Sequence, residues 1–255
     1  MNPSLWLGFL GIGGLVFWEA THGSVAGTAN AHGVIIVFGG TTAALLAATP
    51  FRVLWSAVWR TLNLFLPTSK PNAADAVAAA VALAREAQTG GGLLAIKDTA
   101  NAVAGGFIQR AVTVAIATGE MAETRKIMEK YIRAARVSRQ EDANVLRTAA
   151  VLSPMFGILG TLLGMVQLLA SLTDPSKVGP AMALALSSAV LGIGLANLVF
   201  TPLAGQMRLE AMRETQVFEI LLEGVLEVQA GRQAYMVELH LSSYLAGRED
   251  AAPKA

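Results

Sequence analysis

The sequence contains no cysteine, which excludes disulfide bonds, thiol catalysis and metal sites with cysteine ligands. Charged residues are also scarce. They make up 15% of the chain, against about 25% in typical soluble domains, whereas 54% of the residues are hydrophobic. Together with a mean hydropathy of +0.53, this composition predicts an integral membrane protein.

Sequence motifs of the common enzyme classes are missing as well. The chain has no glycine-rich phosphate loop, no HExxH motif and no recognisable catalytic triad. His22 and His32 lie ten residues apart, which is weak support for a metal site, and we expect both in or beside a surface loop. The sequence therefore predicts a protein that is not an enzyme, with no metal, no cofactor and no nucleic acid partner.

Two long apolar runs dominate what is present. Residues 148–172 and 178–207 contain no charged residue, and the connector between them carries Asp174 and Lys177. Each run exceeds the roughly 20 residues that cross a bilayer, so the two predict a transmembrane hairpin.

Small residues form a face on each of these predicted helices. Lipid provides no hydrophobic drive for helices to associate, so such helices pack by close approach of their backbones over small residues. We expect the hairpin to pack through these faces: Gly157, Gly160 and Gly164 on the first helix, and Ala181, Ala185, Ser188, Gly192 and Ala196 on the second.

The hairpin also contains two prolines, Pro154 and Pro202. Each removes one helical hydrogen bond and frees a carbonyl group, that of Ala150 or Leu198. One interpretation is a tolerated kink. The other is a polar notch that lines an ion path, with hydroxyl groups supplied by Ser153, Thr161, Ser187 and Ser188.

Two further spans are expected near the N-terminus. Residues 4–20 form a short span, interpreted as retained because no basic segment or cleavage site marks a signal peptide. Residues 33–50 form a second span that ends or kinks before Pro50. Its expected small packing face consists of Gly39, Gly40, Ala43 and Ala47.

Residues 51–66 repeat large apolar side chains at helical spacing, which is typical of a helix lying along the inner membrane face. A fifth span is the rival interpretation, but the length of the segment and its two arginines argue against it.

The basic residues fix the predicted topology. Of 19 Lys and Arg residues, 13 lie between residues 51 and 148 and five follow residue 207. The positive-inside rule then places both segments, and both termini, in the cytoplasm. We therefore predict an all-α integral membrane protein with four parts: transmembrane helices 1 and 2 (1–50), a cytoplasmic helical domain with an interfacial helix (51–148), transmembrane helices 3 and 4 (149–207), and a long C-terminal cytoplasmic helix with its tail (208–255).

Local signals divide the cytoplasmic parts into helices. Asn72 is a plausible N-cap, and the TGGG segment ends the first helix. We expect further helices over 107–118 and 120–139, and another from Gln140 into the third span. After Pro202 one helix should continue with an apolar stripe, before a disordered GREDAAPKA tail; the stripe consists of Leu209, Met212, Phe218, Leu222, Val225 and Val228.

Three blocks of the chain resemble one known family. PMFGILGTLLGMVQLL and AMALALSSAVLGIGLANLVFTPLA, within 151–204, resemble the third and fourth membrane helices of MotA/PomA flagellar stator proteins. AHGVIIVFGGTTAALLAATP, at 31–50, resembles their second helix, and 223–245 resembles their C-terminal segment, with Ala234 near the usual proline. TolQ and ExbB share a looser form of the hairpin, but four predicted spans and the GGT motif favour the flagellar branch.

The resemblance implies an A-type subunit in the bacterial inner membrane. It would form a ring, by family five copies, around a dimer of MotB-like single-span subunits, and ion flow would act on a FliG-like protein of the rotor switch complex. Spans two to four contain no ionisable side chain, although a membrane proton relay normally needs one near mid-depth. The essential carboxylate is therefore expected from an aspartate of the partner.

The resemblance also implies site residues. The ion path and its coupling would involve Pro154, Thr161, Ser187, Ser188, Ala189 and Pro202. Sodium stators of the family carry threonines in both hairpin helices. Here Thr161 is kept, but the threonine pair of the fourth helix is replaced by Ser188 and Ala189, which favours protons over sodium as the transported ion.

The rotor-facing loop departs from the family pattern. The expected contacts are Arg85, Glu86, Lys97 and Asp98, with Lys97 where the family often has a glutamate. A solvated charged face is the alternative interpretation. The replacement of the family's glutamate by Lys97 also leaves open that a system other than the flagellum uses this type of ion-driven complex. Two further alternatives remain: a TolQ/ExbB-like energiser of another envelope system, and a membrane scaffold that conducts nothing.

Overall fold

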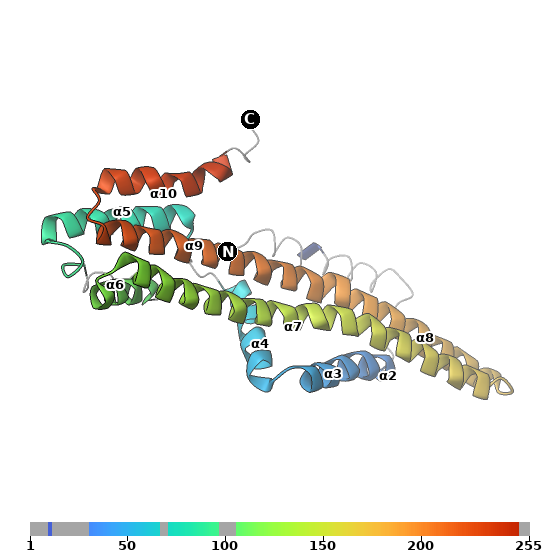
Figure 1. Cartoon of the computed structure of the whole chain (residues 1–255). Helices are drawn as coiled ribbons and strands as arrows, with labels where there is room; N and C mark the ends of the chain where they lie inside the picture. The colour runs from blue at the N-terminus through green and yellow to red at the C-terminus, as the bar shows by residue number, and fades with distance from the viewer. Residues whose placement is uncertain (1–9, 12–30, 67–70, 97–105, 250–255) are drawn as a thin grey trace. The chain divides into compact units, whose positions relative to one another are not determined.

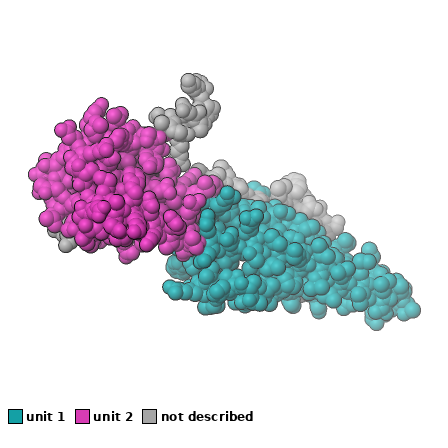
Figure 2. Space-filling view, viewed as in Figure 1, with its two compact units in different colours: residues 1–68, 140–208 teal, residues 69–139, 209–255 magenta. Residues whose placement is uncertain are grey.

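The computed structural model describes residues 10–11, 31–66, 71–96 and 106–249, and all regular elements in these ranges are helices (Figure 1). The predicted span 4–20 lies almost entirely outside the described residues, as do Lys97 and Asp98. The chain forms two structural units (Figure 2). Unit 1 comprises residues 1–68 and 140–208, and unit 2 comprises residues 69–139 and 209–255.

Unit 1 begins with a helical stretch in the predicted second span. Its pieces are α2 (Ala31–Val34), the π-helix η2 (Ile35–Gly39) and α3 (Gly40–Ala48). Thr49 is extended, as expected before Pro50, and α4 (Phe51–Phe65) starts at once. Figure 1 shows α4 turning away from the end of α3 and running across the direction of α2 and α3.

The longest helix, α7 (Met121–Ala170), is unbroken over 50 residues. The expected separation of two helices near residue 140 is wrong: that region contains neither glycine nor proline, so nothing in it stops the helix. The return arm is α8 (Pro175–Gly194), the π-helix η5 (Leu195–Phe200) and α9 (Thr201–Gln229). Among the described residues, the stretches 121–170 and 175–229 are the helices long and apolar enough to cross a membrane.

Unit 2 combines α5 (Ala73–Gly90), α6 (Phe107–Thr118) and α10 (Ala234–Glu249) with α7 up to Arg139 and α9 from Leu209. The N-cap predicted at Asn72 is confirmed: its side chain accepts from the Asp75 backbone N–H at 2.9 Å, and Asp75 accepts from the Asn72 N–H at 3.0 Å. Alanines on α5 let α9 approach closely, since a Cβ atom at Gly224 would lie 2.5 Å from that of Ala80.

The predicted single C-terminal helix is divided in the structure into α9 and α10. Gly231 adopts a left-handed conformation with φ of 70°, and the Arg232 N–H donates to the Glu227 carbonyl at 3.1 Å. This is the Schellman termination that glycine favours. Only the second half of the predicted stripe is buried, because Leu209 and Met212 are 49% and 56% exposed. Helix α10 also extends to Glu249, into the tail expected to be disordered.

Candidate functional site

The two arms of the hairpin touch through their backbones. A Cβ atom at Gly164 would lie 2.7 Å from the backbone nitrogen of Ala185, and one at Gly192 would lie 2.6 Å from the carbonyl oxygen of Ser153. Gly157 faces the Ser188 carbonyl in the same way, at 2.9 Å. These glycines are therefore sites where even a methyl group would force the helices apart.

A third helix reaches the same seam at Ser188. A Cβ atom at Gly33 of α2 would lie 3.0 Å from the Ser188 Oγ and 3.1 Å from the Ser187 Oγ. On the other side, a Cβ atom at Gly160 would meet the Ser188 Cβ at 2.4 Å and the Ile36 Cγ2 at 3.6 Å. We call this meeting of α2, α7 and α8 around Ser188 the three-helix junction.

The packing face predicted for the second span is only partly correct. Gly40 packs tightly, since a Cβ atom there would lie 2.3 Å from the Phe156 ring. Gly39, Ala43 and Ala47 are exposed. Gly33 was missed because it stands at the edge of the predicted loop, where no helical periodicity marks its face.

Five hydroxyl groups lie along or beside the seam. Ser187 and Ser188 are buried and donate to the Leu184 carbonyl at 3.2 and 2.7 Å. Thr161 is half-buried and donates to the Ile158 carbonyl at 2.6 Å. Two more hydroxyls, of Ser153 and Thr41, are buried without a hydrogen-bond partner among the described residues.

The remaining predicted coupling residues lie around this core. Pro154 sits inside α7, where it leaves the Ala150 carbonyl without its usual i+4 donor. Pro202 lies two residues after the end of η5, and the intervening Thr201 N–H donates five residues back, to the Ala196 carbonyl. Ala196 is buried, and Ala189 is only half-buried. The π-helix was not predicted because its apolar sequence looks the same in either helical register.

The predicted rotor contacts are described only in part. Arg85 and Glu86 lie on α5, and the Arg85 Nη2 is 3.8 Å from the Glu238 Oε2 of α10. Both partners are more than half exposed, so this ion pair contributes little stability. Lys97 and Asp98 lie outside the described residues.

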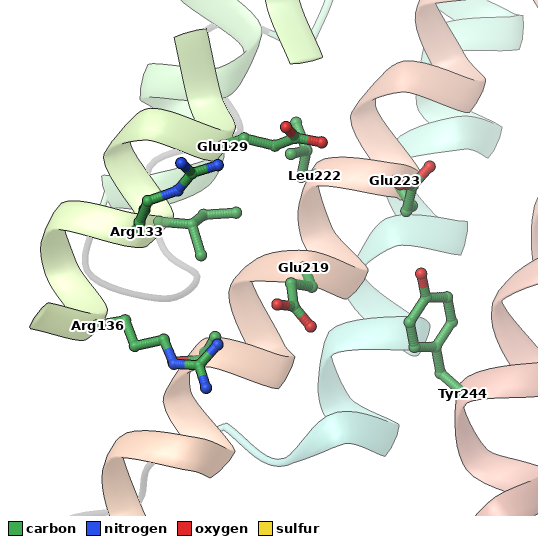
Figure 3. Close-up of a pocket in the computed structure, with 9 residues that line it drawn as sticks. Glu129, Arg133, Arg136, Glu219, Leu222, Glu223 and Tyr244 are labelled. Carbon is green, nitrogen blue, oxygen red and sulfur yellow. The ribbon is translucent and has the colours of Figure 1, made fainter. Parts of the chain in front are cut away.

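Unit 2 contains a cavity of about 370 Å³ between α7, α9 and α10 (Figure 3). Arg125 stands beside it and pairs with the lining residue Glu223 through two hydrogen bonds. This pairing raises the pKa of Arg125 above its ordinary value. The charged lining residues mix both signs: Glu129, Arg133, Arg136, Glu219 and Glu223.

Tyr244 points its hydroxyl toward Glu223 at this cavity (Figure 3). Burial, followed by the charges of Glu223 and Glu219, raises the pKa of Tyr244 above its ordinary value of 10.0. The neutral phenol therefore contributes stability that is complete below pH 10.0 and is lost as the pH rises through the raised pKa.

We expect the melting temperature of the protein to fall more steeply above pH 10.0 than that of the Tyr244→Phe variant, with parallel curves below. Melting both proteins across this range by circular dichroism tests the expectation. Curves that stay parallel above pH 10.0 would contradict a raised pKa for Tyr244.

Comparison with known proteins gives concordant matches. The sequence model of the MotA/TolQ/ExbB proton channel family matches residues 99–220. The chain is 32% identical to the uncharacterised protein YtxD of Bacillus subtilis, covering 81% of this chain and 75% of that one. It is 30% identical to the chemotaxis protein PomA of Vibrio alginolyticus over 67% of this chain and 66% of that one. Motility protein A of Cereibacter sphaeroides is 25% identical over 91% and 90% of the two chains.

Solved structures show the same fold. The structure of C. jejuni MotAB matches with a TM-score of 0.84 and 20% identity, covering 96% of both chains. The flagellar MotAB stator complex from Bacillus subtilis matches with a TM-score of 0.83 and 22% identity, covering 98% of both. The all-helical architecture predicted from the sequence is thereby confirmed.

Proposed function

This chain belongs to the MotA/TolQ/ExbB proton channel family and is a membrane protein, and from that premise we propose that it is the A-type stator subunit of an ion-driven flagellar motor. The observation that carries the proposal is the similarity to motility protein A of Cereibacter sphaeroides, which extends over 91% of this chain. The family is one of channels, and no enzymatic activity is part of the proposal.

The proposed topology has four spans in a bacterial inner membrane, with both termini in the cytoplasm. Support comes from the two long apolar helical stretches, the shorter apolar helix His32–Ala48 and the 13 basic residues between positions 51 and 148. Unit 2 would then be cytoplasmic, with the proposed rotor contacts Arg85, Glu86, Lys97 and Asp98 meeting a FliG-like protein.

The chemistry of the seam supports a partner subunit. The three-helix junction offers serine hydroxyls and backbone groups, but the apolar stretches 32–48, 148–172 and 178–207 contain no acidic or basic residue apart from His32 at the first edge. A proton crossing a membrane needs a titratable group near mid-depth. We propose that a MotB-like single-span subunit supplies an aspartate and that a ring of five copies of this chain surrounds it. The similar solved structures are themselves described as MotAB complexes.

Hydroxyl groups in the junction would accept and pass the ion. Ser187 and Ser188 donate to their own helix, so their lone pairs remain as acceptors for water or a hydrated proton. Ala189 offers no hydroxyl where the sodium stators have one, which supports protons as the transported ion over sodium. Pro154 and Pro202 each remove one backbone hydrogen bond, one on each arm of the hairpin. These missing hydrogen bonds would let the arms bend during ion passage.

We expect this chain alone to leave proteoliposomes impermeable to protons and to conduct once a MotB-like subunit is co-reconstituted. Substituting the membrane aspartate of that subunit by asparagine should return proton uptake to the background rate. A pH-sensitive dye inside the vesicles measures the uptake under an imposed potential.

Native purification identifies the partner. A single-span subunit with a peptidoglycan-binding domain supports the stator proposal, and a partner with a receptor-binding periplasmic domain favours a TolQ/ExbB-like energiser. Proton conduction by this chain alone would overturn the assignment of the carboxylate to a partner. If the chain conducts protons with none of the partners that copurify, the result favours a membrane scaffold that conducts nothing.

A further inference from the structure

Helix α4 carries an outward stripe of large apolar side chains. Its members recur at helical spacing along the whole helix and just beyond it, and each is more than half exposed: Phe51, Trp55, Val58, Trp59, Leu62 and Leu66. Phe51 and Trp55 stack within the stripe, with ring centroids 6.4 Å apart. Among the described residues nothing covers this face.

The opposite face of α4 is fastened to α7. The Arg60 Nε lies 2.9 Å from the Asp142 Oδ2, and the Ser56 hydroxyl donates to the same oxygen at 3.3 Å. The Asp142 side chain is only 3% exposed and that of Arg60 is 29% exposed, so the carboxylate side of this ion pair is shielded from water and salt. The stripe is thus held outward by a buried polar contact on its other side.

Apolar packing fixes the C-terminal end of α4 at a definite level of the hairpin. Leu64 is buried in a cluster with Ala143 of α7 and with Leu203 and Met207 of α9. Met207 is the last residue of the apolar run 178–207, and Ala143 lies five residues before the run 148–172. Helix α4 also runs across the direction of α2 and α3 (Figure 1), so its axis would lie along the plane of the membrane if α2 and α3 cross the bilayer.

Positive charge gathers at the same level. Arg147 directly precedes the apolar run 148–172, Arg208 directly follows the run 178–207, and Arg52 lies on α4; all three are exposed. The acidic side chains within six residues of these arginines are the buried, paired Asp142, the exposed Glu141, and the half-buried Glu210 and Glu214, of which Glu214 pairs with Arg139.

We propose that α4 binds anionic phospholipid of the cytoplasmic leaflet, with its apolar stripe among the acyl chains and Arg52, Arg147 and Arg208 at the phosphate groups. Like the stripe, α7 and α8 expose large apolar side chains. In a membrane protein such surfaces face lipid. Its two tryptophans suit the boundary between acyl chains and headgroups. The charge is complementary to anionic headgroups. The inference rests on membrane insertion, and it stands or falls independently of the stator role.

Tryptophan fluorescence tests the proposal in the full-length protein. Trp6→Phe and Trp18→Phe remove the other two of the four tryptophans, so that Trp55 and Trp59 alone report. In nanodiscs of phosphatidylcholine and phosphatidylglycerol, bromine is placed on the acyl chains of one lipid at a time. We expect both brominated lipids to quench the tryptophan fluorescence. Phosphatidylglycerol should be enriched at the helix about fivefold over phosphatidylcholine, because one arginine at an anionic surface contributes about 1 kcal/mol.

Two variants sharpen the result. Arg52→Gln should reduce the preference for phosphatidylglycerol over phosphatidylcholine, while both lipids still quench the fluorescence. Lys130→Gln, on the exposed surface of unit 2, should change neither the lipid preference nor the quenching. Equal quenching by the two lipids in the unsubstituted chain would overturn the anionic preference. Absence of quenching by either lipid would overturn lipid binding and show that protein, such as a second copy of this chain, covers the stripe.

Discussion

The Gly192→Ala variant is expected to lose proton conduction with its partner and to melt about 2–12 °C lower than the unsubstituted protein. The added methyl group would lie 2.6 Å from the Ser153 carbonyl oxygen and 2.9 Å from the Gly157 Cα. Both contacts are with backbone, so no side chain can rotate away and the two arms of the hairpin must separate. Overpacking of this kind typically costs about 1–3 kcal/mol.

Gly194 provides the matched control two residues further along α8. A Cβ atom there meets nothing within 4 Å, so Gly194→Ala should fold, assemble and conduct like the unsubstituted protein. Thermal melting in detergent and proton uptake in proteoliposomes are measured for both variants. If the two behaved alike, helix propensity or lipid contact would govern this arm, and close backbone packing would not.

The hairpin was predictable because its signals are local and periodic. Glycines at helical spacing in an uncharged run point to one face, and the structure places Gly157, Gly160 and Gly164 against α8. The third participant was not predictable. Gly33 reaches Ser188 from a segment more than 150 positions away in the sequence, and a single glycine beside a loop has no periodicity of its own.

Helix continuity was harder to predict than helix existence. The break at Gly231 depends on one glycine entering the left-handed region, and a glycine in a helical pattern can equally be tolerated. The π-helix before Pro202 depends on hydrogen-bond register, which composition does not encode.

The ion pair between Arg60 and Asp142 is the clearest feature that sequence analysis missed. The two residues lie 82 positions apart, and each is an ordinary charged residue in a helical pattern. Only the folded chain shows that Asp142 is 2% exposed. A carboxylate is rarely buried so completely without a partner, because losing its hydration costs several kcal/mol.

Asp142→Asn is therefore expected to destabilise the protein by about 3 kcal/mol, because Arg60 keeps its charge and its partly buried position but loses its carboxylate. For a chain of this size, that corresponds to a melting temperature lower by about 6–12 °C. The neighbouring substitution Glu141→Gln removes the same charge from an exposed position and should change the melting temperature by about 1–2 °C at most.

Salt distinguishes the buried pair from a surface effect. The difference between the Asp142→Asn variant and the unsubstituted protein should persist at high ionic strength, since a pair shielded from solvent is screened little. If the Asp142→Asn and Glu141→Gln variants changed stability by equal amounts, or if the difference disappeared in salt, overall charge in this part of α7 would govern stability, and the ion pair between Asp142 and Arg60 would not. A persistent difference confined to Asp142 means that α4 is fixed to the hairpin from its polar side, which leaves its tryptophans facing outward.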